Sequence, residues 1–502
     1  MATVKIEQFH GISPRTHPSL LADGMAVTAH NCRLKNGKLV PLRMPSIVGG
    51  VSILMENGLG EIGDAQTLHV WRKRDGSFEF LAFPGVTWMA DGNIADDEKT
   101  RVIVSGATGI PFIEREWDNT KYPPVAAVKR EWTDAPAIYL RDPMFGGKRA
   151  VPLCMETLPQ PLVSRATADE LDEANIRYTR FFWTWVDGDG RESPVSEAST
   201  IANPQNNDYD LEYNDGDTVN FASIIERGGM WPEGAESVRV YKVVTGTEAG
   251  RIQFVAEFTK ANCTAASGEH AGEPGSATLT VRVKDEDAGE VLTQMESAPG
   301  DLRCILKVPG NYYCGFSPSS PHTVMFSDID LPYSWPSDYR YDVDDNLVAL
   351  AVTANTVFAL TDGWPFVLSG TAPESMTVSK LAGPAACVSP RGVVVYRNAV
   401  YFVGNQGLMT IYNDANAGTV CANMTEGIFT KEQWLAKNPA SCVMGQFDGA
   451  LFLFFTRTDG AHEGLSVDLA ESANAVTTHD EVAKCLCVDN KTDRMYFIRE
   501  VS

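Results

Sequence analysis

The chain of 502 residues has no continuous apolar run that approaches 18 residues, so the sequence predicts no membrane-spanning segment. Its first eight residues lack an apolar core, so we expect no signal peptide there. The ten cysteines include no Cys-x-x-Cys and are too few for a disulfide scaffold. Cys485 and Cys487 would share one face of a strand, which is a poor geometry for a bridge. Buried free thiols in a reducing cytoplasm fit this pattern best.

Catalytic and metal-binding motifs are also missing. His462-Glu463 is not part of His-Glu-x-x-His, there is no Gly-x-Ser-x-Gly elbow, and Gly146-Gly147-Lys148 lacks the rest of a phosphate loop. The segment Asp187-Gly188-Asp189-Gly190 resembles the start of a calcium loop, but Arg191 stands at the fifth position. We interpret it as a tight turn between two strands. The sequence therefore predicts no catalytic residue, no cofactor and no metal site.

Acidic side chains outnumber basic ones, 65 against 42, which gives a net charge of −23. Residues 161–300 hold 11 basic and 25 acidic side chains (−14), residues 301–502 hold 13 and 22 (−9), and residues 1–160 are balanced at 18 each. Such a chain is not expected to bind nucleic acid, because this binding needs clustered Lys and Arg. The simpler interpretation is that acidity keeps the protein soluble. The second is that an acidic surface repels DNA that must pass without sticking.

Most of the sequence patterns that predict secondary structure indicate β-strands. Asp-Gly pairs between alternating apolar runs are the strongest short hairpin signal, and they recur along the chain. The flanking runs are rich in β-branched and aromatic residues. Examples are Phe78–Phe83, Val102–Val104, Val238–Val244, Val393–Tyr396 and Leu451–Phe455. Two short helices are expected, Ala166–Ile176 with Thr167 as its N-cap and Thr430–Lys437 with Thr430 as its N-cap.

The spacing of these strands divides the chain into four segments. Residues 1–50 lack hairpins and form an N-terminal arm or lead-in. Residues 51–160 and 301–502 carry hairpins at short spacing, as in the four-stranded units of a propeller. Residues 161–300 have the size of an immunoglobulin-like or fibronectin-like sandwich. The predicted fold is mostly β, a β-propeller-like hub with an inserted β-sandwich and few short helices, and two separate sandwiches are the alternative.

An aromatic run at residues 178–186 opens the predicted sandwich. Exposed Trp183 and Trp185 would be able to stack on sugars or bases. Alternating aromatic residues also fill the core of a sandwich. We favour the core for both tryptophans.

Several phrases occur in a fixed order along the chain. The opening contains Gly11-Ile12-Ser13-Pro14-Arg15, Asn31-Cys32 and Leu34-Lys35-Asn36-Gly37-Lys38-Leu39-Val40-Pro41-Leu42-Arg43. The middle contains Phe182–Asp187, Gly190–Ser196 and Val238–Lys242. The third group contains Val324–Asp328, Leu331-Pro332-Tyr333-Ser334-Trp335-Pro336, Leu360–Gly370, Cys387–Arg391, Gly404–Met409 and Phe429–Trp434. The ordered set spans roughly residues 8–455, and it resembles the tail nozzle (tail tubular, or tail hub) proteins of short-tailed bacteriophages.

The resemblance implies a structural virion protein and not an enzyme. Such proteins assemble, commonly as six copies, below the portal and its adaptor, and form the distal end of the tail tube through which genomic DNA is ejected. Six copies would carry 6 × −23 = −138 formal charges. The implied partners are further copies of the chain, tail adaptor or head-to-tail connector proteins, tail fibre or tail tip proteins, and duplex DNA in transit without sequence-specific binding. The implied location is the virion tail, after assembly in the host cytoplasm.

The arm has a different charge from the rest of the chain. Residues 1–50 hold six basic and two acidic side chains, a net charge of +4. We hypothesise that the arm seats against an acidic neighbour such as the adaptor. The residues proposed for this contact are Arg15, Arg33, Lys35, Lys38 and Arg43. The sequence does not predict which residues line the DNA channel.

Two other classes of function are consistent with the sequence. A β-propeller with an inserted sandwich is also suited to a receptor-binding or glycan-binding protein at the host surface. A tail enzyme that degrades polysaccharide needs a pair of carboxylates, and the sequence nominates no such pair.

Overall fold

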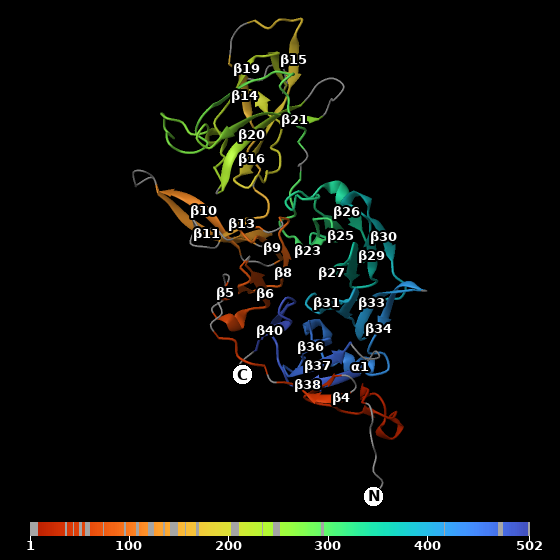
Figure 1. Cartoon of the computed structure of the whole chain (residues 1–502). Coiled ribbons are helices and arrows are strands. Elements are labelled where there is room, and N and C mark those ends of the chain that lie inside the picture. The colour runs from red at the N-terminus through yellow and green to blue at the C-terminus, as the bar shows by residue number, and fades with distance from the viewer. Residues whose placement is uncertain are drawn as a thin grey trace. The chain divides into compact units, whose positions relative to one another are not determined.

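The structure is a computed structural model, drawn in Figure 1, and strands far outnumber helices in it. The prediction of a mostly β fold is therefore confirmed. Gly146-Gly147-Lys148 lies outside the described residues. The described residues are 9–499 with gaps at 36–37, 44, 50–52, 56–60, 74, 95–96, 107–109, 119–124, 134–135, 141–148, 156, 167–169, 202–209, 233, 244–250, 293–295, 416 and 470–474.

The chain folds into two compact units. Unit 1 comprises Met1–Pro152, Pro299–Pro332 and Asp338–Ser502. Unit 2 comprises Leu153–Ala298 and the short segment Tyr333–Ser337. The chain thus leaves unit 1, builds most of unit 2, and returns to unit 1 at Pro299 for most of the remaining residues.

Four consecutive sheets of four antiparallel strands make up most of unit 1 after residue 300. The first contains β23 (Arg303–Val308), β24 (Tyr312–Ser317), β25 (Ser320–Phe326) and β26 (Arg340–Asp342). The second contains β27 (Leu347–Thr353), β28 (Thr356–Thr361), β29 (Phe366–Ser369) and β30 (Thr377–Lys380). The third contains β31 (Val393–Tyr396), β32 (Ala399–Val403), β33 (Leu408–Asp414) and β34 (Gly418–Asn423). The fourth contains β35 (Val443–Phe447), β36 (Ala450–Thr456), β37 (His462–Asp468) and β38 (Ala475–His479).

Strands from both ends of the chain complete unit 1. Near the C-terminus, β39 (Cys485–Asp489) pairs with β40 (Arg494–Ile498). A three-stranded sheet has the order β5 (Ile53–Met55), β7 (Phe78–Phe83), β6 (Thr67–Arg72). A four-stranded sheet has the order β13 (Arg149–Pro152), β12 (Ala137–Leu140), β9 (Val102–Gly106), β8 (Thr87–Asp91). The remaining two-stranded pairs are β10 (Ile110–Asp118) with β11 (Val125–Thr133), β1 (Gly11–Ile12) with β2 (Met25–Ala26), and β3 (Cys32–Lys35) with β4 (Lys38–Pro41). The antiparallel strands β3 and β4 are two residues apart and form a hairpin, so the prediction that residues 1–50 lack hairpins is wrong.

The apolar core of unit 1 lies between successive sheets. In the second sheet, Leu350 and Leu368 pack with residues of the first sheet such as Phe326. Leu360, on the opposite face of the second sheet, packs with Phe402 of the third. Alternate residues of a strand point to opposite faces, so one sheet contributes to two core layers. The predicted runs Phe78–Phe83, Val102–Val104, Val393–Tyr396 and Leu451–Phe455 all lie in strands, which confirms these predictions.

Unit 2 consists of three small sheets around an aromatic core. The sheet orders are β17-β14-β19-β22, β15-β18 and β16-β20-β21. The strands are β14 (Leu162–Arg165), β15 (Ile176–Thr179), β16 (Phe181–Asp187), β17 (Thr200–Ile201), β18 (Leu211–Asn214), β19 (Thr218–Phe221), β20 (Ala235–Val243), β21 (Ile252–Thr259) and β22 (Leu279–Arg282). Trp183 and Trp185 are buried, and the Trp183 ring lies 6.0 Å from the ring of Phe221. The assignment of both tryptophans to the core is confirmed.

One of the two predicted helices is present. Thr430 caps α1 (Lys431–Leu435), where its hydroxyl accepts a hydrogen bond from Gln433 N and Gln433 Oε1 accepts one from Thr430 N. The other prediction, Ala166–Ile176, is wrong for the part that the structure describes, and its expected cap Thr167 lies outside that part. Residues 170–175 form turns and loop, because the carboxylate of Asp172 accepts hydrogen bonds from Ala174 N and Asn175 Nδ2. A side chain that satisfies the backbone locally competes with the helix.

Short helical turns and hairpin turns connect the strands. The 3-10 turns are η1 (Pro18–Leu20), η2 (Ile62–Asp64), η4 (Ile225–Arg227), η5 (Ser337–Tyr339), η6 (Pro373–Ser375) and η7 (Pro439–Ser441). Asp448-Gly449 and Asp459-Gly460 form the turns on either side of β36, as the sequence predicts. In the part of the chain that the structure describes, no helix combines the length and the apolar composition needed to cross a membrane.

Candidate functional site

The N-terminal arm, which the sequence nominates as a contact surface, lies along β38 of unit 1. Backbone hydrogen bonds join Asn31 N to Thr478 O over 2.8 Å and Thr478 N to Ala29 O over 2.9 Å. His30 Nε2 and Asn31 Nδ2 each lie 2.9 Å from Oδ2 of Asp480. The arm therefore covers the edge of the fourth sheet, which would otherwise offer unpaired backbone groups to another strand.

A glycine permits the closest approach of the arm to the sheet. Gly11 has a φ of +103°, and a Cβ atom at this position would lie 2.7 Å from the backbone nitrogen of Val476. Ile12 and Leu34 of the arm are buried and pack with residues of the third and fourth sheets. The first glycine of the arm is thus needed both for its backbone conformation and for its lack of a side chain.

Two of the five proposed contact residues form ion pairs within this chain. The guanidinium of Arg33 and the ammonium of Lys35 both bind the carboxylate of Asp448, Lys35 Nζ at 3.1 Å. Burial raises the pKa of Asp448, but the hydrogen bonds from Lys35 and Arg33 outweigh it and hold this pKa below its ordinary value. The side chain of Arg33 is only 11% exposed, so this contact fixes β3 on the turn between β35 and β36.

The other three proposed residues face solvent. Arg15 follows β1, Lys38 begins β4 opposite Lys35, and Arg43 follows β4. All three are exposed, and none forms an ion pair with a carboxylate in the described residues. The structure therefore separates the five residues into an internal anchor, Arg33 and Lys35, and an outward basic set, Arg15, Lys38 and Arg43.

A polar pocket of about 640 Å³ lies beside the internal anchor. Its walls come from β3 and from three hairpin turns, those of β31–β32, β35–β36 and β39–β40. Its charged lining residues are Arg33, Lys35, Arg397, Asp448, Asp468 and Asp493. Three basic and three acidic side chains balance, so the pocket has no net preference for an anion or a cation.

A larger and more apolar hollow, here called the arm groove, lies on the other side of Arg33. It has a volume of about 1260 Å³ and runs between residues 40–43 and 45–48 of the arm, with Ile53 of β5, and the strands β7, β36 and β40. Phe80, Phe454 and Tyr496 form part of its floor, and Ile47 and Val48 lie on the arm side. Ile47 is fully exposed and Val48 is half exposed, so apolar surface extends beyond the groove.

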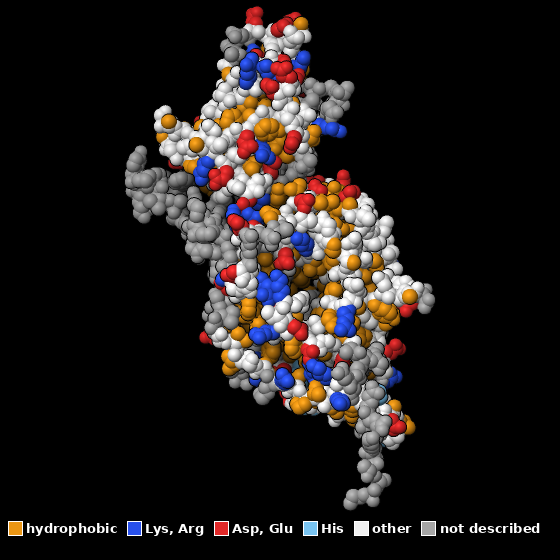
Figure 2. All heavy atoms as spheres, in the orientation of Figure 1, with side chains coloured by type: hydrophobic (Ala, Val, Ile, Leu, Met, Phe, Trp, Pro, Cys, Tyr) orange, Lys and Arg blue, Asp and Glu red, His pale blue; other side chains and the backbone are white. Residues whose placement is uncertain are grey.

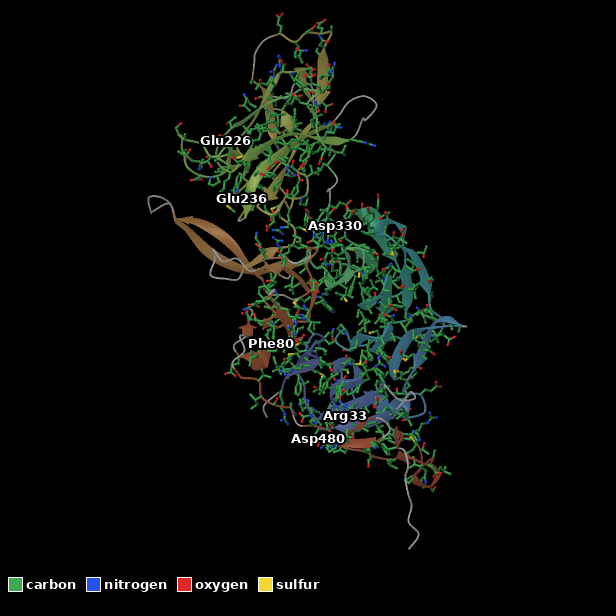
Figure 3. All side chains as sticks on the ribbon, in the orientation of Figure 1. Arg33, Phe80, Glu226, Glu236, Asp330 and Asp480 are labelled. Carbon is green, nitrogen blue, oxygen red and sulfur yellow. The ribbon has the colours of Figure 1, made fainter. Side chains whose placement is uncertain are left out.

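Basic side chains surround the arm groove. Its charged lining residues are Arg33, Lys35, Arg43, Arg494, Arg499, Asp448 and Glu481. Five positive against two negative charges give +3, in a chain whose net charge is −23. Figure 2 shows basic side chains among hydrophobic ones over the lower part of unit 1, and Figure 3 places Arg33 and Asp480 there. The arm groove is therefore apolar inside and basic at its rim.

His479 lies in the wall of the arm groove and is 1% exposed. Its ring packs against the ring of Phe454 at 5.2 Å and that of Phe452 at 6.0 Å. Burial lowers the pKa of His479 to about 4, so the imidazole is neutral at pH 7. It adds no positive charge to the groove.

The calcium-like segment of unit 2 is a turn. Asp187 ends β16, and its Oδ1 accepts hydrogen bonds from Asp189 N at 2.9 Å and Arg191 N at 2.8 Å. Its Oδ2 accepts a third hydrogen bond from Arg191 Nε at 2.7 Å. Arg191 thus occupies the carboxylate that a calcium ion would need, and no set of three candidate metal ligands is found among the described residues.

The cysteines offer no reactive thiol. All ten are free, and most are buried. Burial raises the pKa of Cys304 and Cys387 to about 12, so both thiols are protonated at neutral pH. Cys485 and Cys487 occupy alternate buried positions of β39 on one face, as the sequence predicts.

Comparison with known proteins adds only distant likenesses. No family model and no curated protein matches the chain. Hsv2 of Kluyveromyces lactis (complete loop 6CD) is 8% identical with a TM-score of 0.22, over 47% of this chain and 57% of that one. Apo AztD of Citrobacter koseri is 13% identical with a TM-score of 0.27, over 64% and 77%. A functionally unknown protein of Desulfotomaculum acetoxidans is 7% identical with a TM-score of 0.22, over 51% and 80%. Likenesses this weak carry no argument about this chain.

Sequence reasoning identified the arm but not the groove beside it. The groove combines the arm with β36 and β40, which lie more than 400 residues further along the chain. The family resemblance ends near residue 455, so it implies no function for the residues that follow. One feature of the sequence could have indicated the groove. It is the apolar strand Arg494-Met495-Tyr496-Phe497-Ile498-Arg499, which has a basic residue at each end.

Proposed function

We propose that this chain is a structural subunit of the tail nozzle of a short-tailed bacteriophage. In this proposal several copies, commonly six, close into a ring at the distal end of the tail tube, and genomic DNA leaves through the ring. The observation that carries the proposal is the ordered series of nozzle-like phrases over roughly residues 8–455. Each phrase is weak alone, whereas their common order along the chain is not expected by chance.

The mostly β structure supports the expected hub. Four consecutive antiparallel sheets, β23–β26, β27–β30, β31–β34 and β35–β38, follow one another in chain order with core layers between them. This is the pattern of propeller blades, and we propose that unit 1 is a β-propeller. The strands β5–β9, β12 and β13, before unit 2, and the hairpin β39–β40 supply its remaining blades.

Unit 2 fits the inserted sandwich that the resemblance implies. Its three sheets enclose a core with Trp183, Trp185 and Phe221, and its strands are short and mainly antiparallel. We propose an immunoglobulin-like or fibronectin-like sandwich between two parts of the propeller. Most of the negative charge lies in residues 161–300, at −14, so this unit is the most acidic part of the subunit.

The charge of the chain supports a conduit for DNA. Six copies would carry −138 formal charges, and a channel lined by carboxylates makes few attractive contacts with phosphates. DNA would therefore slide through without sequence-specific binding. We assign the subunit no catalytic role, no cofactor and no metal, and we propose the virion tail as its location, with adaptor and tail fibre or tip proteins as neighbours.

The test is cryo-electron microscopy of the purified protein, alone and mixed with its candidate adaptor ring. We expect a closed ring with an axial channel wide enough for a duplex and lined by carboxylates. Monomers under both conditions would contradict the proposal. Saturable glycan binding by such a monomer would favour a receptor-binding protein, and release of reducing sugar from a surface polysaccharide would favour a tail enzyme.

A further inference from the structure

A small acidic surface patch of unit 1, here called the acidic knob, complements the arm groove in charge and in apolar character. It comprises Ile94, Asp328, Ile329 and Asp330. Ile94 is 51% exposed and Ile329 is 42% exposed, so two large apolar side chains lie in solvent. Asp328 and Asp330 flank Ile329 in the chain and place negative charge on both sides of it.

The knob is held in one shape by hydrogen bonds between separate segments. Asn93 Nδ2 donates to Asp330 O over 2.7 Å, and Asn311 Nδ2 donates to Asn93 O over 3.0 Å and also binds the carboxylate of Asp330. Asp328 Oδ1 accepts from Ile329 N at 3.0 Å. These bonds hold the loop of Ile94 against the loop of Ile329, so the apolar pair is presented without a large ordering cost.

We propose that the acidic knob of one copy of this chain docks into the arm groove of the next copy. The groove is apolar inside with a basic rim, and the knob is apolar at its tip with acidic flanks, so both the apolar and the charged surfaces match. This inference rests on the proposed ring. Arg33 marks the groove and Asp330 marks the knob, and in Figure 3 they lie at opposite ends of unit 1. One copy therefore does not fill its own groove, and a head-to-tail contact between two different patches either closes a ring or grows a filament.

The size of the groove favours a protein segment over a small molecule. Small-molecule sites are typically enclosed hollows of about 300–1,000 Å³. The arm groove measures about 1260 Å³ and is bounded on one side by an arm segment whose Ile47 is fully exposed. Its rim residues Arg43, Arg494 and Arg499 are all exposed and suited to steering an acidic partner towards it.

The test uses charge reversal on each surface. The groove variant is R43E/R494E and the knob variant is D328K/D330K, and both are assayed for self-association by mass photometry and sedimentation velocity of the full chain. We expect self-association of each variant alone to weaken by about a hundredfold or more, because like charges then face each other. Far-UV circular dichroism and the melting temperature check that each variant is folded.

A mixture of the two variants gives the decisive result. In an equimolar mixture every acidic groove meets a basic knob and every basic groove meets an acidic knob. We expect rings to return, made of the two variants in alternation and therefore with an even number of subunits. Folded variants whose mixture stays monomeric overturn the proposal.

One matched control separates this contact from net charge, and a second knob variant tests the apolar tip. E226K/E236K changes the charge by the same +4 as the knob variant, at two exposed acidic residues of unit 2, and we expect its rings to equal those of the parent chain. I94S/I329S removes the apolar tip without any change in charge and is expected to weaken assembly.

If the parent forms rings and the groove and knob variants form them equally well, the docking inference fails while the proposed function stands. If the groove variant forms rings but loses the adaptor, the groove belongs to the adaptor and this inference is wrong. If the parent chain forms no assembly either alone or with the adaptor ring, both fail.

Discussion

Arg72 on β6 binds Asp489 at the end of β39, 417 positions further along the chain. Arg72 Nε lies 3.1 Å from Oδ1, and a second guanidinium nitrogen binds Oδ2. The rings of Phe80 and Tyr496 meet beside this pair, with centroids 5.0 Å apart. Segments from the first and last hundred residues of the chain therefore pack against each other within unit 1.

The ion pair of Arg72 and Asp489 predicts a measurable acid sensitivity. The hydrogen bond from Arg72 lowers the pKa of Asp489 from 3.8 to about 2. A folded pKa below the unfolded one stabilises the protein above about pH 4, and this contribution is lost as the pH falls towards 2. Asp489→Asn should therefore lower the free energy of unfolding by about 2 kcal/mol at pH 7. Urea unfolding of both proteins at pH 7 and pH 2.5 should show the difference shrinking in acid.

A surface carboxylate gives the control for this prediction. Asp344 pairs with Lys380 at 2.8 Å, but its side chain is 67% exposed. Exposed ion pairs contribute about 0–1 kcal/mol, so Asp344→Asn should change stability little. Equal losses for the two variants would mean that burial of the Arg72–Asp489 pair adds nothing.

His479 predicts a second pH dependence, in a higher range. Burial lowers its pKa from 6.5 to about 4, so the folded chain holds this ring neutral where the unfolded chain would protonate it. The corresponding stabilisation is complete above about pH 6.5 and is lost as the pH falls to 4. It amounts to about 3 kcal/mol over that range. His479→Gln should remove this part of the slope of stability against pH, which urea unfolding of the parent chain and the variant between pH 4 and pH 7 measures.

The core of unit 2 depends on Trp183. Its side chain is fully buried, and its Nε1 donates a hydrogen bond to Pro159 O at 2.7 Å. Trp183→Ala leaves a cavity and an unpaired carbonyl, and should destabilise unit 2 by about 3–5 kcal/mol. Limited proteolysis should then cleave within residues 153–298 before any site in unit 1. The control is Trp364→Ala, at a partly buried ring in unit 1, and it should not increase cleavage within unit 2. If it does increase this cleavage, the two units do not unfold separately.

Local features of the fold could be predicted from sequence because local chemistry determines them. Phe78–Phe83 is rich in aromatic residues and forms β7, and Thr430 caps α1 through a reciprocal bond with Gln433. The predicted helix at Ala166–Ile176 is absent from residues 170–176, which the structure describes, for an equally local reason. Asp172 satisfies backbone and side-chain donors at positions 174 and 175, and this interaction competes with helix formation.

The candidate site could not be predicted to the same extent because distant segments build it. Arg33 was recognised as part of a basic arm, but its partner Asp448 lies 415 positions away in a hairpin turn that resembles any other Asp-Gly turn. Likewise, the floor of the arm groove brings Phe80, Phe454 and Tyr496 together from three separate strands. Nothing in the spacing of these residues indicates that they meet.

The close contact of Gly11 with β38 leads to a prediction about how tightly the arm is bound to this strand. Its φ of +103° disfavours any residue with a side chain, and a Cβ atom there would also lie 2.7 Å from Val476 N. Gly11→Ala should therefore lift the start of the arm from β38, and the amides of Asn31 and Thr478, which now bond across this contact, should exchange with solvent faster. Hydrogen exchange measured by mass spectrometry on the peptides that contain these two amides tests this, with about tenfold faster exchange expected for a local opening.

A second glycine separates backbone strain from loss of the contact. Gly460 has a φ of +81°, but no atom lies within 4 Å of a Cβ built there. Gly460→Ala therefore carries the strain of a left-handed backbone, about 1 kcal/mol, without a clash. We expect it to lower stability slightly and to leave exchange at Asn31 and Thr478 as in the parent chain. If Gly11→Ala behaved like Gly460→Ala, the close approach at Gly11 would have no role in binding the arm to the sheet.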